Sequence, residues 1–234
     1  DFNNLLFRGY DALESLEAYA KDVETRASTR VIVSSPDKLA SATIRNFEVT
    51  GEMLGNYVAP VSCDVSSGNS CKMHFTPIPL VRRVQVTLNV RGLNNVRKVR
   101  CTLNDVPLSV FLHNGHAGEE LGSQEFTVGS PVYEEGSFTE GKLTGMFDVF
   151  SLDRLMSHSM TLKALLVDGK TVVEQVLTDV IVKEKIDDVG SITFYIDAPI
   201  PETIPDVKPE GSADSGFDVD VDDWKEDEEI DIPI

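Results

Sequence analysis

Residues 81–91, VRRVQVTLNVR, decide the fold class of this 234-residue chain. Val84, Val86, Leu88 and Val90 alternate with polar residues, so one face of the segment is apolar and the other is polar. A two-residue period is typical of a half-buried β-strand, because successive side chains of a strand point to opposite sides. The stretch therefore predicts a strand that covers a hydrophobic core.

Short segments of the same character follow along the chain. Cys101 is in phase with Val99 and Leu103, which predicts a core position for its thiol. Asp168-Gly169 is a two-residue hairpin signature. The predicted strands cover residues 96–103, 106–112, 124–128, 142–150, 160–167, 171–182 and 192–196. Many short strands separated by turns predict a mainly β protein, an antiparallel sandwich or barrel and not a parallel α/β sheet. Of the two we favour an antiparallel Greek-key β-sandwich.

One helix is predicted before these strands, over residues 10–27. Its apolar residues recur at helical spacing, and a capping box precedes them: Leu13, Leu16, Ala20 and Val23 form the stripe, and Asp11 and Glu14 form the box. Residues 1–71 hold too few elements for a closed core. We therefore expect a remnant of an N-terminal domain at 1–71 and a β-sandwich domain at 72–234.

Charge is distributed unevenly along the chain. The net charge is −18. Residues 202–234 carry 13 acidic residues against Lys208 and Lys225, whereas residues 65–104 carry seven basic residues and no acidic one. An acidic protein of this kind is a poor nucleic-acid binder, so no nucleic-acid partner is expected. Attraction is expected between the two segments, within one molecule or between neighbours.

Two of the three cysteines flank a turn-rich loop. Cys63 and Cys71 are separated by DVSSGNS, and a disulfide could close this loop in an oxidising compartment. Two unlinked thiols are the alternative.

The acidic C-terminal segment allows two interpretations. Asp218, Asp220, Asp222 and Glu229 have EF-hand spacing, but Asp223 stands where that loop needs glycine. The alternative is a strand with one acidic face, because Phe217, Val219 and Val221 alternate with the acids. We favour the strand, with Trp224 as a core marker, and predict no metal site there.

Chemistry-bearing motifs are missing from the sequence. It has no nucleophile elbow, no phosphate-binding loop and no dinucleotide fingerprint. His113 and His116 lie three apart in a glycine-rich loop without a third ligand, which indicates a solvated turn. No catalytic residue, no cofactor and no enzymatic activity are therefore predicted.

Several local sequences, in order along the chain, resemble the Bacteroidales fimbrillin-like lipoprotein family of fimbrial anchors and minor subunits. They are residues 7–9 (FRG), 16–19 (LEAY), 35–39 (SPDKL), 79–84 (PLVRRV), 90–93 (VRGL), 141–145 (GKLTG) with Phe150, 166–170 (LVDGK) and 217–224 (FDVDVDDW). The resemblance implies transthyretin-like β-sandwich domains on an outer-membrane lipoprotein that faces outward. It also implies that most of the first domain and the lipid-bearing cysteine precede Asp1.

The resemblance further implies a non-enzymatic structural or adhesive role, as a fimbrial anchor, assembly factor or accessory subunit. Its partners would be fimbrial subunits or other surface proteins joined by β-strand pairing, with membrane attachment only through the lipid anchor. Ile230, Ile232 and Ile234 alternate at the C-terminus and form a possible strand-exchange segment; pairing within their own domain is the alternative. A different function also fits a sandwich with exposed loops, namely a surface module that binds carbohydrate or a host ligand.

Overall fold

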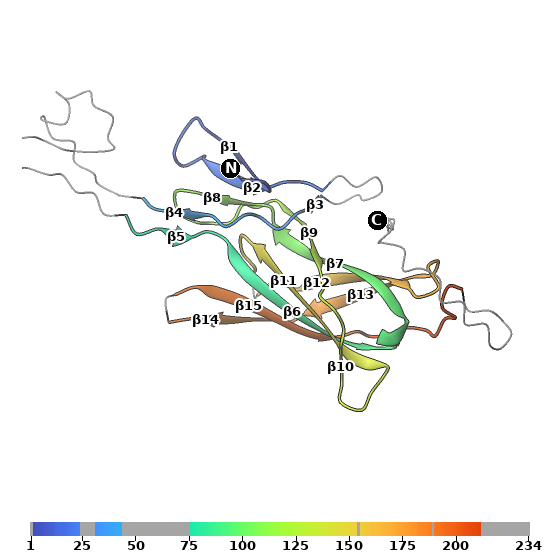
Figure 1. The fold of residues 1–234 in the computed structure, drawn as a ribbon. Coiled ribbons are helices and arrows are strands. Elements are labelled where there is room, and N and C mark those ends of the chain that lie inside the picture. Colours follow the sequence, from blue (N-terminus) through green and yellow to red (C-terminus); the bar gives the residue numbers. More distant parts are fainter. Residues whose placement is uncertain (1, 24–30, 44–74, 154, 189, 212–234) are drawn as a thin grey trace, which may run out of the picture.

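The computed structural model describes residues 2–23, 31–43, 75–153, 155–188 and 190–211. Two five-stranded sheets form the body of the protein, and a three-stranded sheet lies beside them (Figure 1). The mainly β sandwich predicted from the sequence is confirmed. No helix among the described residues has the length and apolar character needed to cross a membrane.

The first main sheet, called here the β6 sheet, has the strand order β10-β11-β6-β15-β14. Its strands are β6 (Arg82–Arg91), β10 (Val132–Tyr133), β11 (Glu140–Val149), β14 (Val182–Ile186) and β15 (Ile192–Pro199). Neighbours are antiparallel except β15, which runs parallel to β6. Strands from both ends of the sandwich sequence thus meet at the centre of this sheet.

The second main sheet, called here the β7 sheet, has the order β13-β12-β7-β9-β3. Its strands are β3 (Ile32–Val33), β7 (Val96–Pro107), β9 (Leu121–Thr127), β12 (His158–Leu166) and β13 (Val172–Val180). The short helix η1 (Leu93–Asn95) leads from β6 into β7. Only β3 is parallel to its neighbour, β9. The two parallel pairs depart from the antiparallel prediction, because each joins strands far apart in the sequence through a crossover.

One hydrophobic core lies between the two main sheets. Val84, Val86, Leu88 and Val90 of β6 are all buried in it, as the alternation predicted. Cys101 is also buried there, at 1% exposure, and this burial raises the pKa of its thiol to about 12. Each fully buried large aliphatic side chain contributes about 1.5–3 kcal/mol, so this layer dominates the stability of the fold.

A smaller cluster lies under the three-stranded sheet β1-β2-β8. Its strands are β1 (Leu5–Arg8), β2 (Glu17–Ala20) and β8 (Ser109–Phe111), and a separate pair is formed by β4 (Ala40–Ser41) and β5 (Ile78–Pro79). Leu5, Ala18 and Ala20 pack there with Val110 and Phe150. Residues from the start of the chain thus share a core with residues of the sandwich sequence. The domain boundary at residues 71 and 72 stays a prediction.

The helix predicted over residues 10–27 is wrong. The described part of that segment, up to residue 23, is a turn followed by β2. Gly9 has a φ of 76°, and a Cβ there would meet the carbonyl oxygen of Ser15 at 1.9 Å, so the chain doubles back on itself. Leu13 of the predicted stripe is exposed. Residues 17–20 pair with strands on both sides, β1 and β8, and this tertiary pairing outweighed the local preference for a helix.

The chain after β15 closes one end of the sandwich. Residues 200–211 pass from the β6 sheet towards the β12–β13 turn: the amide of Ile200 donates to Asn89, and that of Glu210 donates to Val167. The side chain of buried Gln175 bonds both the amide and the carbonyl of Glu202, at 3.1 Å each. This segment is therefore an integral part of the fold.

Candidate docking surfaces

The two long sides of the sandwich differ in how their edges are covered. On one side the two main sheets touch: Val128, the residue after β9, forms an antiparallel β-bridge with Gly145 of β11. Phe126 and Phe147 stack beneath this junction with ring centroids 4.4 Å apart. A Cβ on Gly145 would meet the ring of Phe126 at 3.0 Å, so glycine permits the close approach. The two sheets are therefore joined at this point, with the short strands β10 and β3 outermost on this side.

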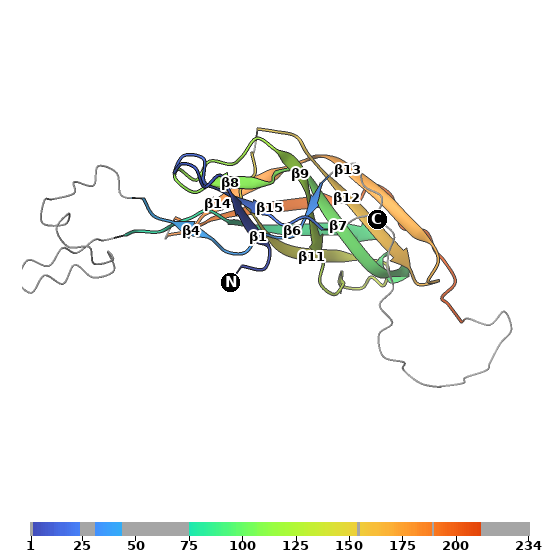
Figure 2. The same cartoon turned by 90° about the horizontal axis from the view of Figure 1, so that it is seen from above.

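On the other side, β13 and β14 are the outermost strands of different sheets, and only Ile181 separates them. Among the described residues β13 pairs only with β12, and β14 pairs only with β15. Figure 1 shows β14 along the lower margin of the molecule, and Figure 2 shows β13 along the upper margin. Every second residue of an edge strand directs its amide and carbonyl away from the sheet, so both strands offer backbone groups for pairing.

The longer of these edges is β13. Its register with β12 is regular from Val172 to Leu177, and a bulge follows where Asp179 adopts a φ of 54°. Val176 is 52% exposed, and Val172 is exposed as well. β-Branched residues on a long edge favour addition of another strand, while the bulge limits the usable length to the regular part.

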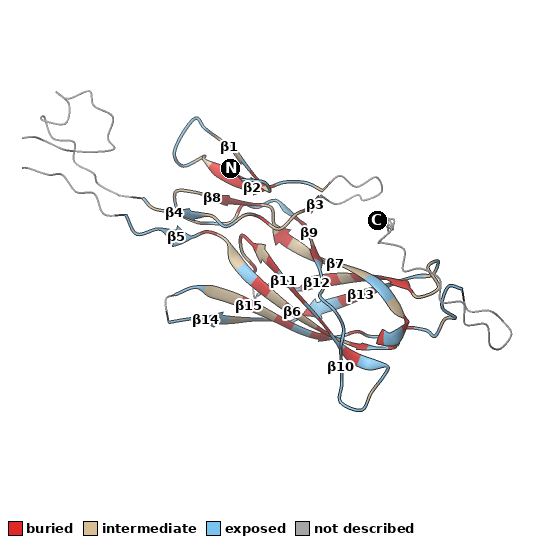
Figure 3. Cartoon of the chain, viewed as in Figure 1, coloured by how far each residue is buried: buried red, intermediate tan, exposed pale blue. Residues whose placement is uncertain are grey.

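The outer face of the β6 sheet collects polar side chains from four strands. In one row Met146, Gln85 and Tyr195 lie on neighbouring strands, with Lys183 next to Tyr195. None of these four is buried, and Met146 is 66% exposed. Figure 3 shows how buried positions alternate with more exposed ones along β6. The face therefore presents a methionine, an amide, a phenol ring and an ammonium group in sequence across the sheet.

The outer face of the β7 sheet is composed differently. Lys163 of β12 pairs with Glu174 of β13 at 3.2 Å, and Arg100 of β7 pairs with Glu125 of β9 at 3.8 Å. Lys163 and Arg100 are cross-strand neighbours, and Thr161 and Thr102 face each other in the adjacent row. Lys163 and Arg100 thus each have a carboxylate partner on an adjacent strand.

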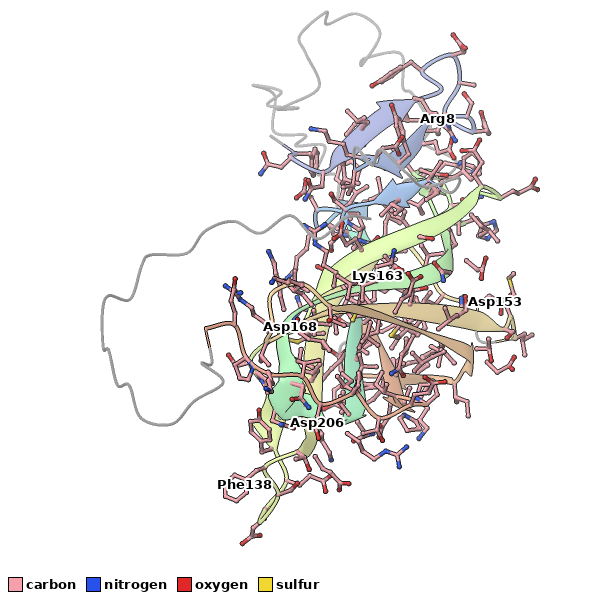
Figure 4. The ribbon with its side chains drawn as sticks, turned by 90° about the vertical axis from the view of Figure 1, so that its right-hand side faces the viewer. Arg8, Phe138, Asp153, Lys163, Asp168 and Asp206 are labelled. Carbon is pink, nitrogen blue, oxygen red and sulfur yellow. The ribbon has the colours of Figure 1, made fainter. Side chains whose placement is uncertain are left out.

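A hairpin projects from the β6 sheet between β10 and β11. Phe138 near its tip is 87% exposed, and Val132 and Tyr133 at its base are exposed too. Figure 4 shows Phe138 at the far end of this hairpin, away from the core. An exposed aromatic side chain is a common anchor in protein interfaces.

A charged network lies on the small sheet. The guanidinium of Arg8 donates to both carboxylate oxygens of Glu17, at 2.7 and 3.2 Å, and to Glu120 at 3.0 Å. Ser109 also donates to Glu17, and Arg8 lies over the ring of Tyr19. The Arg8 bonds hold the pKa of the nearly buried Glu17 carboxyl below its ordinary value, and burial opposes them. The pKa of Arg8 is raised, mainly by the same hydrogen bond.

The sequence-predicted sites fall largely outside the described residues. These are the possible disulfide partners Cys63 and Cys71, the core marker Trp224, and the strand-exchange segment Ile230, Ile232 and Ile234. His116 lies within the described ranges and contacts Asn114 in its own loop. The described residues contain no group of three or more potential ligands that could hold a metal ion.

Sequence reasoning did not find either docking surface. The edge position of β13 depends on which strands are neighbours, and the row of Met146, Gln85 and Tyr195 joins three distant segments. Alternation in each strand did show which residues share a face, and this was the one available signal.

The fold defines a β-sandwich protein, and the first 127 residues match the family described as a domain of unknown function, DUF5119. This match covers more than half of the chain, so the protein belongs to that family. No match was found among curated proteins.

Two crystal structures of proteins from Bacteroides ovatus, each described as a "putative adhesin", are similar to this chain. The first aligns with a TM-score of 0.55 at 16% identity, covers 76% of this chain and shows the shared fold. The chain spans only 61% of the length of that structure. The second aligns with a TM-score of 0.38 at 8% identity, and the alignment covers 82% of this chain and 68% of that structure's chain.

Proposed function

We propose that this protein is a non-enzymatic cell-surface adhesion protein that acts as a fimbrial anchor, assembly factor or accessory subunit. It would be exposed on the outer membrane and lipid-anchored in its precursor. The fold shared with the first Bacteroides ovatus structure supports an adhesive role, and the fimbrillin-like sequence motifs support the fimbrial one.

The observation that carries the proposal is the edge of β13. From Val172 to Leu177 this strand is regular, and among the described residues it pairs on one side only. Backbone hydrogen bonds along such an edge provide affinity, and alternate side chains provide specificity. Partner subunits would therefore add a strand here.

Ile230, Ile232 and Ile234 are the proposed donor of that strand to a neighbouring molecule. The segment alternates, as a strand with one apolar face does, and its acidic neighbours keep it soluble before pairing. In this arrangement the C-terminus of one subunit would pair with β13 of the next.

Sedimentation velocity over a range of concentrations tests the proposal. The full chain is expected to self-associate, whereas a chain ending at Glu229 stays monomeric. Val176→Lys should block association because a charge at an edge disfavours pairing. Thr161→Lys is the matched control, since Thr161 is the cross-strand neighbour of Val176 but lies inside the sheet.

Hydrogen exchange locates the contact. Amides of β13 should gain protection when the full chain associates, and amides of β3 should not. A full chain that remains monomeric at every concentration, or a Val176→Lys variant that associates normally, contradicts the proposal.

A further inference from the structure

The outer face of the β6 sheet carries cations without described carboxylate partners. Lys142 extends from β11, and Lys183 and Lys185 extend from β14; all three are exposed. No ion pair joins any of them to another described residue, and on this face only Arg83 has one, with Asp148 at 3.4 Å. The face also carries three carboxylates, those of Glu140, Asp148 and Asp197, against five basic side chains, those of Arg83, Arg91, Lys142, Lys183 and Lys185. It thus keeps an excess of positive charge on a protein whose net charge is −18.

The lysines flank a polar and aromatic centre. The register places Lys183 opposite Tyr195, Tyr195 beside Gln85, and Lys142 opposite Asn89. Neighbouring strands lie about 4.8 Å apart, so the three steps from β14 to β11 span roughly 14 Å. Asn89 lies four residues along β6 from Gln85, so Lys142 is displaced along the strands from the row of Tyr195. An extended ligand that runs diagonally over the face from Lys183 to Lys142 would meet positive charge at both ends, with the phenol ring next to Lys183.

The centre offers donors and acceptors in fixed positions. Asn89 donates to one carboxylate oxygen of Asp197 at 2.9 Å, which orients both side chains. Thr87 lies opposite Asp197 on one side and Thr144 on the other, so one hydroxyl group adjoins the carboxylate and a second lies one strand further away. Amides, hydroxyls and a carboxylate around an aromatic ring are the groups that bind sugar hydroxyls and stack on a sugar ring.

We propose that this face binds a carboxylate-bearing polysaccharide, such as a polymer of uronic acids. The lysines would pair with the sugar carboxylates, Tyr195 would stack on a sugar ring, and Gln85 and Asn89 would bond hydroxyl groups. A protein partner would favour a larger apolar centre than Met146 alone provides. This binding is separate from strand pairing at β13, so either can fail without the other.

Biolayer interferometry of the full chain on immobilised polygalacturonate at low salt tests the proposal. The double variant Lys183→Gln/Lys185→Gln should weaken binding about tenfold, as expected for loss of two exposed charge pairs of moderate strength. Tyr195→Ala should weaken binding as well, with unchanged thermal unfolding. Lys163→Gln on the opposite face is the matched control and should bind as the parent chain does.

Three further immobilised polymers show which ligand groups the protein recognises: hyaluronan carries carboxylates, heparin adds sulfates, and neutral galactan carries no charge. Binding to polygalacturonate or hyaluronan that exceeds binding to galactan supports the proposal. It is overturned if the parent chain binds neither carboxylated polymer, or if Lys163→Gln weakens binding as much as the double variant. Equal or tighter binding to heparin or to a single-stranded DNA oligonucleotide also overturns it, because that result indicates attraction to any polyanion.

Discussion

Both outer faces of the sandwich are formed by strands in which apolar and polar residues alternate, but the two faces arrange their charges in opposite ways. On the β7 sheet, Lys163 and Arg100 each have a carboxylate partner on the adjacent strand. On the β6 sheet, Lys142, Lys183 and Lys185 have no such partner among the described residues, and Tyr195 lies between them. Paired charges satisfy each other and help fix register, whereas unpaired ones remain available to a ligand. The difference supports the proposed binding role of the β6 face and a structural role for the charges of the β7 face.

The largest expected effect is on the free energy of unfolding and concerns the core side of both sheets. Leu88 on the β6 sheet and Leu162 on the β7 sheet are both fully buried in the common core. Replacing either with alanine should lower the free energy of unfolding by about 2–5 kcal/mol, since each change leaves a cavity. Urea unfolding measures this. A much smaller cost for only one of them would show that the two sheets do not contribute equally to the core.

The next effect concerns the Arg8–Glu17 pair, whose carboxylate is the most buried among the ion pairs of the described residues. Glu17→Gln should cost about 1–3 kcal/mol at neutral pH, because it weakens hydrogen bonds from a charged group. The pKa of Glu17 is lowered in the folded state, so its contribution is present above the ordinary value of 4.5 and is lost as the pH falls through the folded-state pKa. The parent chain should therefore lose more stability on acidification than Glu17→Gln. Equal acid sensitivity of the two chains, measured by thermal unfolding from pH 7 to pH 3, would contradict this.

A smaller effect is expected from the paired charges of the β7 sheet. A double-mutant cycle on Lys163 and Glu174 should give a coupling of about 0.2–1 kcal/mol, the range of partly exposed pairs. The same cycle on Lys183 and Asp197 of the β6 sheet should give no measurable coupling, because no ion pair joins them. Coupling of equal size on both faces would remove the distinction between them.

The smallest effect is expected at the centre of the β6 face. Met146→Ala and Tyr195→Ala should each change the free energy of unfolding by no more than about 0.5 kcal/mol, because both side chains project outward. Loss of several kcal/mol on either substitution would assign that side chain to the fold rather than to binding. Guanidinium unfolding of the purified variants provides the measurement.

The sequence by itself determined the fold class and the face of each strand. The four alternating residues Val84, Val86, Leu88 and Val90 all reached the core, and Cys101 joined them. The turn at Asp168-Gly169 connects β12 to β13 as predicted. These features succeeded because they depend on contacts between near neighbours in the chain and on the two-residue period of a strand.

Tertiary structure decided the rest. The segment around Glu17 had a helical pattern, yet it became a strand because β1 and β8 offered partners on both sides. Likewise, Gln85, Met146 and Tyr195 form one row only because β6 lies between β11 and β15. Alternation shows which side of a strand a residue takes, but neighbours in a sheet are chosen by packing between distant segments, and that choice created both candidate docking surfaces.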